Sequence, residues 1–314
     1  MQKICIYGIG GVGGYFGGKI AYEAQQQQKE AQVYFIARGP HLTAIQQQGL
    51  VLNSSEQQGM RCYPTLATEQ IQQIPAPDLC IVSVKGYDLD IAAQALAAHI
   101  KDSTIILPLL NGVDIYDRLR RHISTGIILP SCVYIRAYIE QPGVVAETGS
   151  GGQIICGDDP EVPEFDPHPL LAFFEQMHIR CTWQADPSAA IWEKYMFIAS
   201  YGLVTTYSGK TLGEVMDDQE LAATTRSIIR EIWKIANQCG VSFSEEMIES
   251  AFQKAKVFPY DTTTSYQRDV TAKGKKNEGD LFGGTILRLG KKFGVATPET
   301  ETIYHAIEER LCQN

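Results

Sequence analysis

The sequence lacks a long apolar run, and positive charge is scarce. No window approaches the roughly 18 consecutive apolar residues of a membrane-spanning helix. The start does not resemble a signal peptide, because Lys3 is its only basic residue and the apolar run leads straight into glycines. With 27 Lys and Arg against 36 Asp and Glu, the net charge is −9, which argues against broad binding of nucleic acid or anionic membranes. We therefore expect a cytoplasmic protein with neither kind of partner.

The 8 cysteines form no CxxC pair, so the spacing typical of a zinc site is missing. Several of them lie in apolar runs, as Cys80 does between Leu79 and Ile81. Buried, reduced thiols are the expected use of cysteine in such positions. We predict no metal site.

The most informative stretch is the first one, where an apolar run from Ile4 to Tyr7 leads into Gly8-Ile9-Gly10-Gly11-Val12-Gly13. In a strand–turn–helix unit, Gly8 permits the turn, Gly10 lets a pyrophosphate approach the backbone, and Gly13 lets the helix pack closely on the strand. The amide groups at the start of the helix then attract the phosphates. The spacing predicts a dinucleotide site, with a plain structural turn as the alternative.

Polar residues follow three further predicted strands, namely Arg38 after 32–37, Lys85 after 78–84 and Asn111 after 103–110. Ligands of parallel sheets gather at the carboxyl ends of strands, so these residues are placed to meet the cofactor. Arg38 stands where a carboxylate would bind the adenosine ribose, and its nearest acidic neighbour in the sequence before it is Glu30. NADP(H) is therefore favoured over NAD(H). An exposed arginine and a simple Asn-Gly turn are the alternatives for Arg38 and Asn111.

Strand and helix patterns alternate up to residue 183, with an irregular or hairpin excursion over 50–76, and from Asp186 the pattern is mainly helical. This change predicts an α/β protein with two domains. Residues 1–185 form a Rossmann NADP-binding domain, and residues 186–314 form an all-helical domain that carries the substrate and catalytic residues.

Two charged residues of the second half are candidates for chemistry. Lys194 lies in an apolar helix predicted over 187–200, and a partly desolvated lysine has a lowered pKa and can serve as an acid. It could equally extend to solvent or pair with Glu193. Glu278 lies near the start of a later helix, where a carboxylate also complements the helix dipole.

An ordered set of segments resembles the ketopantoate reductase (2-dehydropantoate 2-reductase) family over essentially the whole chain. The segments are Gly8 to Gly17, Ala37 to His41, Val84-Lys85, Leu110 to Val113, Trp192-x-Lys194, Ser265-x3-Asp269, Asn277-Glu278-x-Asp280 and Gly294-Val295-x-Thr297-Pro298. The family reduces the 2-keto group of ketopantoate with NADPH to give pantoate, for pantothenate and coenzyme A biosynthesis. The resemblance implies this activity and a small-molecule 2-keto acid as partner. It leaves the oligomeric state open, with a homodimer as one option.

The resemblance also implies roles for residues. Arg38 would bind the 2′-phosphate, Lys85 would lie near the cofactor phosphate, and Asn111 would contact both the nicotinamide and the substrate. In the helical half, the expected roles are general acid for Lys194, hydroxyl binding and support of the lysine for Glu278, and substrate carboxylate binding for Ser265.

The sequence departs from the family pattern on the helix of Lys194. Members usually carry asparagines four and eight residues after the lysine, where this chain has Ile198 and Gly202, and the interval from Asp269 to Glu278 is one residue longer than expected. Three alternatives stay open. Ser200, Tyr201 or Thr205 could help to bind the substrate, the substrate could be another branched 2-keto acid, or the protein could be a non-catalytic NADP(H) sensor. Retention of Lys194 and Glu278 counts against the sensor, because a pure binder needs no proton donor.

Overall fold

A computed structural model describes residues 1–26, 31–149, 151–272 and 276–313. The chain forms two compact units. The first unit comprises Met1–Asn111 and Ile115–Pro187, and the second comprises Gly112–Asp114 and Ser188–Asn314. Within the described ranges, no helix has both the length and the apolar character needed to cross a membrane.

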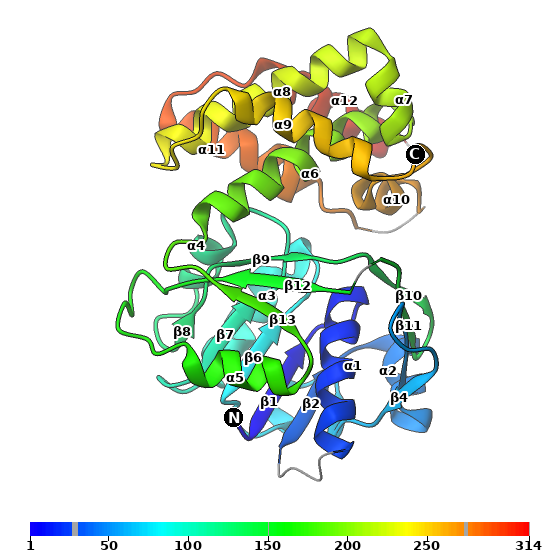
Figure 1. Cartoon of the computed structure of the whole chain (residues 1–314), viewed down its shortest axis with the longest axis vertical. Helices are drawn as coiled ribbons and strands as arrows, with labels where there is room; N and C mark the ends of the chain where they lie inside the picture. The colour runs from blue at the N-terminus through cyan, green and yellow to red at the C-terminus, as the bar shows by residue number, and fades with distance from the viewer. Residues whose placement is uncertain (27–30, 150, 273–275, 314) are drawn as a thin grey trace. The chain divides into compact units, whose positions relative to one another are not determined.

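The first unit is built on a parallel sheet of six strands in the order β5-β2-β1-β6-β7-β8 (Figure 1). The strands are β1 (Lys3–Tyr7), β2 (Gln32–Ile36), β5 (Leu66–Thr68), β6 (Leu79–Val82), β7 (Ile105–Pro108) and β8 (Ile127–Ile128). Every residue of β6 and β7 is buried, as expected where helices cover both faces of a parallel sheet. The strand order turns back at β1, which makes its carboxyl end a switch point for ligands.

The connections are largely helical, as the sequence predicts for a Rossmann fold. They are α1 (Gly11–Gln26), α2 (Gly39–Gln48), η1 (Ile71–Gln73), η2 (Gly86–Asp88), α3 (Leu89–Ala97), α4 (Ile115–Arg120) and, later in the chain, α5 (His168–Gln176). The predicted strand, glycine turn and helix at the start of the chain are confirmed by β1 and α1.

Two smaller sheets complete the first unit. One has the order β10-β11-β3-β4, and the other has the order β13-β12-β9. Their strands are β3 (Leu50–Asn53), β4 (Met60–Cys62), β9 (Ser131–Tyr134), β10 (Ala137–Gln141), β11 (Val144–Glu147), β12 (Gln153–Cys156) and β13 (Arg180–Trp183). Helix α1 packs against β1 and β2 of the large sheet and against all four strands of the β10-β11-β3-β4 sheet. The excursion expected over 50–76 therefore supplies strands to two different sheets.

The second unit contains only helices among its described residues. They are α6 (Ser188–Ser208), α7 (Leu212–Asp217), α8 (Gln219–Gln238), α9 (Glu246–Gln253), η3 (Lys254–Val257), α10 (Ser265–Thr271), the π-helical η4 (Asp280–Gly284), α11 (Thr285–Phe293) and α12 (Pro298–Gln313). Helix α6 lies at the centre and packs against α8, α10, α12 and η4. The Rossmann fold with a helical second part is thus confirmed.

Two details of the second unit differ from the sequence-based expectation. Helix α6 runs through Gly202 to Ser208, because Gly202 lies against Tyr266 inside the packed unit. Glu278 directly precedes the helix that it was expected to open, because helical structure resumes at Gly279 and continues as a π-helical turn from Asp280. Its carboxylate is therefore not a first-turn helix residue.

Candidate functional site

The strand register brings the expected cofactor residues to one edge of the large sheet. Tyr7 pairs with Ile36 on one side and with Val82 on the other, and Val82 pairs with Pro108. These four residues end their strands, so the segments that follow them start at the same edge. Those segments carry Gly8, Arg38, Lys85 and Asn111.

The glycine turn has the geometry that close approach requires. Gly8 adopts a φ of +101°, and a Cβ there would lie 2.8 Å from the Val84 nitrogen. A Cβ on Gly13 would lie 2.0 Å from the Gly8 carbonyl oxygen. Gly10, in contrast, has no described atom within 4 Å of a built Cβ, so its backbone faces open space. A turn that is tight on the protein side and open at Gly10 fits a dinucleotide pyrophosphate.

Contacts from distant segments hold this turn. The Gly8 amide donates to the Ile36 carbonyl over 3.0 Å, and the Ser83 hydroxyl donates to the Gly8 carbonyl over 2.8 Å. From the β10 strand, the Ala137 carbonyl comes so near that a Cβ on Gly11 would lie 2.2 Å from its oxygen. Neither Ser83 nor Ala137 was identified from the sequence. The position of Ser83 near the carboxyl end of the strand predicted over 78–84 was its one local signal, and Ala137 had none.

Arg38 precedes α2 and has an acidic partner that lies 50 residues away in the sequence. Its guanidinium pairs with the Asp88 carboxylate at the end of η2, and 72% of its side chain is exposed against 16% for Asp88. Next to it, the Gly39 amide donates to the Glu69 carboxylate over 3.2 Å. The expectation of an arginine without acidic neighbours is therefore wrong in three dimensions.

Lys85 and Asn111 lie at the same edge. Lys85 is exposed directly before η2, and its carbonyl accepts the Asp88 amide over 2.9 Å. Asn111 is half-buried and is the last residue of the first unit before the chain enters the second. Gly112 has a φ of +136°, and the chain bends at this Asn-Gly pair, in keeping with the turn interpretation. The turn and a ligand role for Asn111 are compatible.

In the second unit, Lys194 lies on α6, and Glu278 precedes η4, which packs against α6. Both are buried, with 9% and 7% of their surface exposed. The hydroxyl of Tyr195, the neighbour of Lys194, donates to the carbonyls of Leu281 and Phe282 over 2.7 and 2.9 Å. The Leu281 amide in turn donates to the Glu278 carbonyl over 3.0 Å. An ammonium and a carboxylate are thereby held at low exposure on two elements that are tied together.

The hydroxyl groups near Lys194 are already in use. Ser200, Tyr201 and Thr205 are buried, and they donate to the carbonyls of Met196, Phe252 and Tyr201 over 2.6, 2.8 and 2.7 Å. These three hydroxyls could therefore offer a substrate only acceptor positions, and their help in substrate binding stays a prediction. Ser265 is different, since it is exposed at the first position of α10.

Tyr266 was not identified from the sequence and lies against the Lys194 helix. Its Cβ and Cδ1 are 3.8 and 3.9 Å from a Cβ built on Gly202, and its hydroxyl is 2.6 Å from one built on Gly279. The side chain is 1% exposed, and its hydroxyl has no hydrogen-bond partner in the described part of the chain. Burial raises its pKa, so this phenol stays protonated at neutral pH. Glycine at 202 and at 279 makes room for an aromatic ring.

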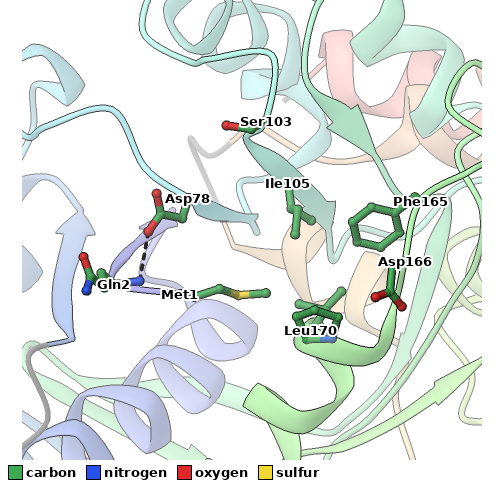
Figure 2. Close-up of a pocket in the computed structure, with 9 residues that line it drawn as sticks. Met1, Gln2, Asp78, Ser103, Ile105, Phe165, Asp166 and Leu170 are labelled. Atoms are coloured by element: carbon green, nitrogen blue, oxygen red, sulfur yellow. Dashed lines mark hydrogen bonds between the residues drawn. The ribbon is translucent and has the colours of Figure 1, made fainter.

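A separate hollow of about 380 Å³ lies at the opposite edge of the sheet (Figure 2). It is lined at the amino ends of the strands by Met1, Gln2, Asp78 and Ile105, and by Phe165 and Leu170 from the segment around α5. The amides of Gln2 and Lys3 donate to the Asp78 carboxylate over 2.9 and 3.0 Å. Ligands of such sheets bind at the carboxyl ends, so this hollow is not the dinucleotide site.

The fold and the glycine turn are those of the dinucleotide-binding proteins. Residues 4–161 match the family model described as ketopantoate reductase PanE/ApbA, and residues 186–310 match the model of its C-terminal part. Together the two models cover most of the chain. The protein belongs to the ketopantoate reductase PanE/ApbA family, and the resemblance read from the sequence is confirmed.

Relatives match over nearly full length at low identity. An uncharacterised oxidoreductase of Bacillus subtilis, YkpB, is 25% identical over 303 residues, covering 96% of this chain and 97% of the relative. A 2-dehydropantoate 2-reductase of Halobacterium salinarum is 25% identical over 313 residues, covering 99% of both chains. Among solved structures, a PanE/ApbA family ketopantoate reductase from Ralstonia eutropha matches with a TM-score of 0.87 at 24% identity, covering 99% of both chains. D-mandelate dehydrogenase, solved with NADH and anilino(oxo)acetate, matches with a TM-score of 0.86 at 22% identity and the same coverage.

Proposed function

We propose that the protein reduces 2-dehydropantoate (ketopantoate) to pantoate with NADPH, as a step of pantothenate and coenzyme A biosynthesis. The observation that carries this proposal is the burial of Lys194 and of Glu278 on two elements that Tyr195 ties together, in a chain whose other unit carries an open glycine turn. The family assignment and relatives named 2-dehydropantoate 2-reductase support it.

The residues divide the work as follows. When bound, the dihydronicotinamide supplies the hydride. Lys194 binds the substrate carbonyl oxygen and gives it a proton as negative charge develops there. Glu278 accepts a hydrogen bond from the substrate hydroxyl and keeps the ammonium positioned. Ser265, exposed at the start of α10, binds the substrate carboxylate.

The first unit binds the cofactor in this proposal. Residues from Gly8 to Gly13 hold the pyrophosphate at the start of α1, and Lys85 lies near the phosphates. Asn111 faces the nicotinamide and the substrate. Arg38 binds the 2′-phosphate, which favours NADPH over NADH.

A second candidate is reduction of another branched 2-keto acid with an apolar side chain. In a helix, residues four apart share a face, so Ile198 and Gly202 continue the face of Lys194. That face offers an aliphatic side chain and the ring of Tyr266, and the nearby hydroxyls are bonded within the helix bundle. The likeness in fold to D-mandelate dehydrogenase is consistent with a different 2-keto acid.

The test is NADPH oxidation by the purified protein with a panel of 2-keto acids. Ketopantoate should be reduced with the highest kcat/KM, and ketoisovalerate, which lacks the hydroxymethyl group, serves as the control. A higher kcat/KM for ketoisovalerate would favour the second candidate. If no 2-keto acid is reduced while NADPH still binds, the protein is a cofactor-binding sensor and the proposal is wrong.

A further inference from the structure

The adenosine end of the expected cofactor site carries more negative than positive charge. Arg38 is bound to Asp88, and the amide that follows Arg38 is bound to Glu69. The two carboxylates come from the segments after β6 and β5, which are separated in the sheet by β1 and β2. At the start of α2, one carboxylate therefore pairs with the guanidinium and a second binds the backbone amide of the next residue.

The two partners of the ion pair differ in their freedom to move. The Arg38 side chain is mostly exposed, so it can turn to another anion with little disturbance. The Asp88 side chain is mostly buried, and its amide is fixed by the Lys85 carbonyl. When Arg38 leaves, the Asp88 carboxylate stays in place.

This difference has opposite consequences for the two cofactors. A 2′-phosphate must take Arg38 away from Asp88 and then lies close to an uncompensated carboxylate, which repels it. A ribose with free hydroxyls instead donates hydrogen bonds to a carboxylate, as in NAD-binding sites of this fold. Asp88 thus opposes one cofactor and suits the other.

We propose that Asp88 determines the cofactor specificity of this protein, by competing with the 2′-phosphate for Arg38 and by accepting the ribose hydroxyls of NADH. The inference rests on the proposed function, since it concerns the cofactor of that reaction. Arg38 still favours NADPH, but Asp88 offsets part of that preference, so the native protein accepts both cofactors.

The experiment measures the Kd of NADPH and of NADH, by quenching of protein fluorescence, for the native protein, for Asp88→Asn and for Glu249→Gln. Glu249 pairs with Arg226 in the second unit, so its substitution changes the net charge equally at a distant ion pair. In Asp88→Asn, NADPH should bind about tenfold more tightly and NADH about tenfold more weakly, as expected for charge-assisted contacts. In Glu249→Gln, the ratio of the two Kd values should equal that of the native protein.

The outcomes separate the inference from the proposed function. If both cofactors bind the native protein and Asp88→Asn leaves the ratio unchanged, or weakens both equally, the specificity role of Asp88 is wrong. If the native protein binds neither cofactor, the proposed function fails as well. If Asp88→Asn does not fold, the affinities of the native protein for 2′-AMP and for 5′-AMP provide the test instead. Their affinities should differ by no more than about tenfold, and a larger preference for 2′-AMP overturns the inference.

Discussion

At the scale of single residues, burial of Lys194 is the feature with the clearest chemical consequence. A buried ammonium loses hydration, so the protein must surround it with compensating groups. Tyr195, the neighbour of Lys194, ties α6 to η4, the element that Glu278 precedes. Such a lysine can hold a developing alkoxide and give up its proton.

Replacing Lys194 with Ala should lower kcat by on the order of 10²- to 10⁴-fold, the usual contribution of a positioned general acid. Lys194→Arg should not restore the rate, because a guanidinium keeps its proton at working pH. Steady-state kinetics with the best 2-keto acid, alongside melting curves that show both variants folded, make the measurement. If the kcat of Lys194→Ala equals that of the native protein, Lys194 is not the general acid.

Arg38 is the second residue with a sharp expectation. Replacing it with Ala should weaken NADPH binding by an amount equivalent to about 1.5–3 kcal/mol, because a charge-assisted contact to the 2′-phosphate is lost. NADH affinity should change far less, since NADH has no phosphate there. Titration of both cofactors by fluorescence checks this, and equal losses for the two would mean that Arg38 acts only through the fold.

At the scale of elements, the glycines of the turn have two different roles, close packing and access for a ligand, which the sequence motif alone does not distinguish. Gly13 is required by packing, whereas Gly10 faces open space. Gly13→Ala should destabilise the first unit, because its Cβ would overlap the Gly8 carbonyl. Gly10→Ala should melt close to the native temperature and yet bind the dinucleotide much more weakly. Melting curves with and without cofactor test this pair, and equal melting of the two variants would contradict it.

The start of α12 is held by a carboxylate from another helix. The Glu231 side chain on α8 accepts hydrogen bonds from the Glu299 and Thr300 amides and from the Thr300 hydroxyl, over 2.9, 3.1 and 2.6 Å. Burial nevertheless raises the pKa of Glu231 above its usual value of 4.5, although these donors favour the charged form. The native state therefore binds this proton more readily than the unfolded chain does.

The sign of the pH dependence follows from the raised pKa. Between pH 4.5 and the higher native value, the contribution of Glu231 to the free energy of unfolding falls as pH rises. Glu231→Gln removes this titration, so the native protein should gain stability relative to the variant as pH is lowered through that window. Melting temperatures of both proteins over a pH series provide the comparison, and a constant difference would refute the argument.

Elements also show what sequence patterns can and cannot predict. The strand, turn and helix of residues 3–26 depend on neighbours in sequence, so the spacing of the glycines predicts them. Other contacts join residues that lie 50 to 75 positions apart, and no local pattern marks them. They pair Arg38 with Asp88, Ser83 with Gly8, and Tyr266 with Gly202. Strand pairing also joins distant parts of the chain. The sequence therefore predicted only an irregular or hairpin excursion, where the structure has β3, β4 and β5 in two sheets.

At the scale of the whole molecule, the proposed labour is divided between the units. The glycine turn, Arg38 and Lys85 lie in the first unit, and Lys194, Ser265 and Glu278 lie in the second. The roles of most of these residues remain predictions from family resemblance, because a fold alone positions backbone and leaves chemistry to be measured.

This division predicts how cofactor binding and catalysis separate. NADPH at about 100 times its Kd should stabilise the native protein by about 2.7 kcal/mol, because a ligand of the folded state adds its binding free energy to the stability. Lys194→Ala should show the same rise in melting temperature with NADPH while its turnover is lost, whereas Gly10→Ala should show little rise. Differential scanning calorimetry of the three proteins with and without NADPH makes the measurement. If Lys194→Ala folds but gains no stability from NADPH, the lysine contributes to cofactor binding, and its loss of turnover no longer identifies it as a proton donor.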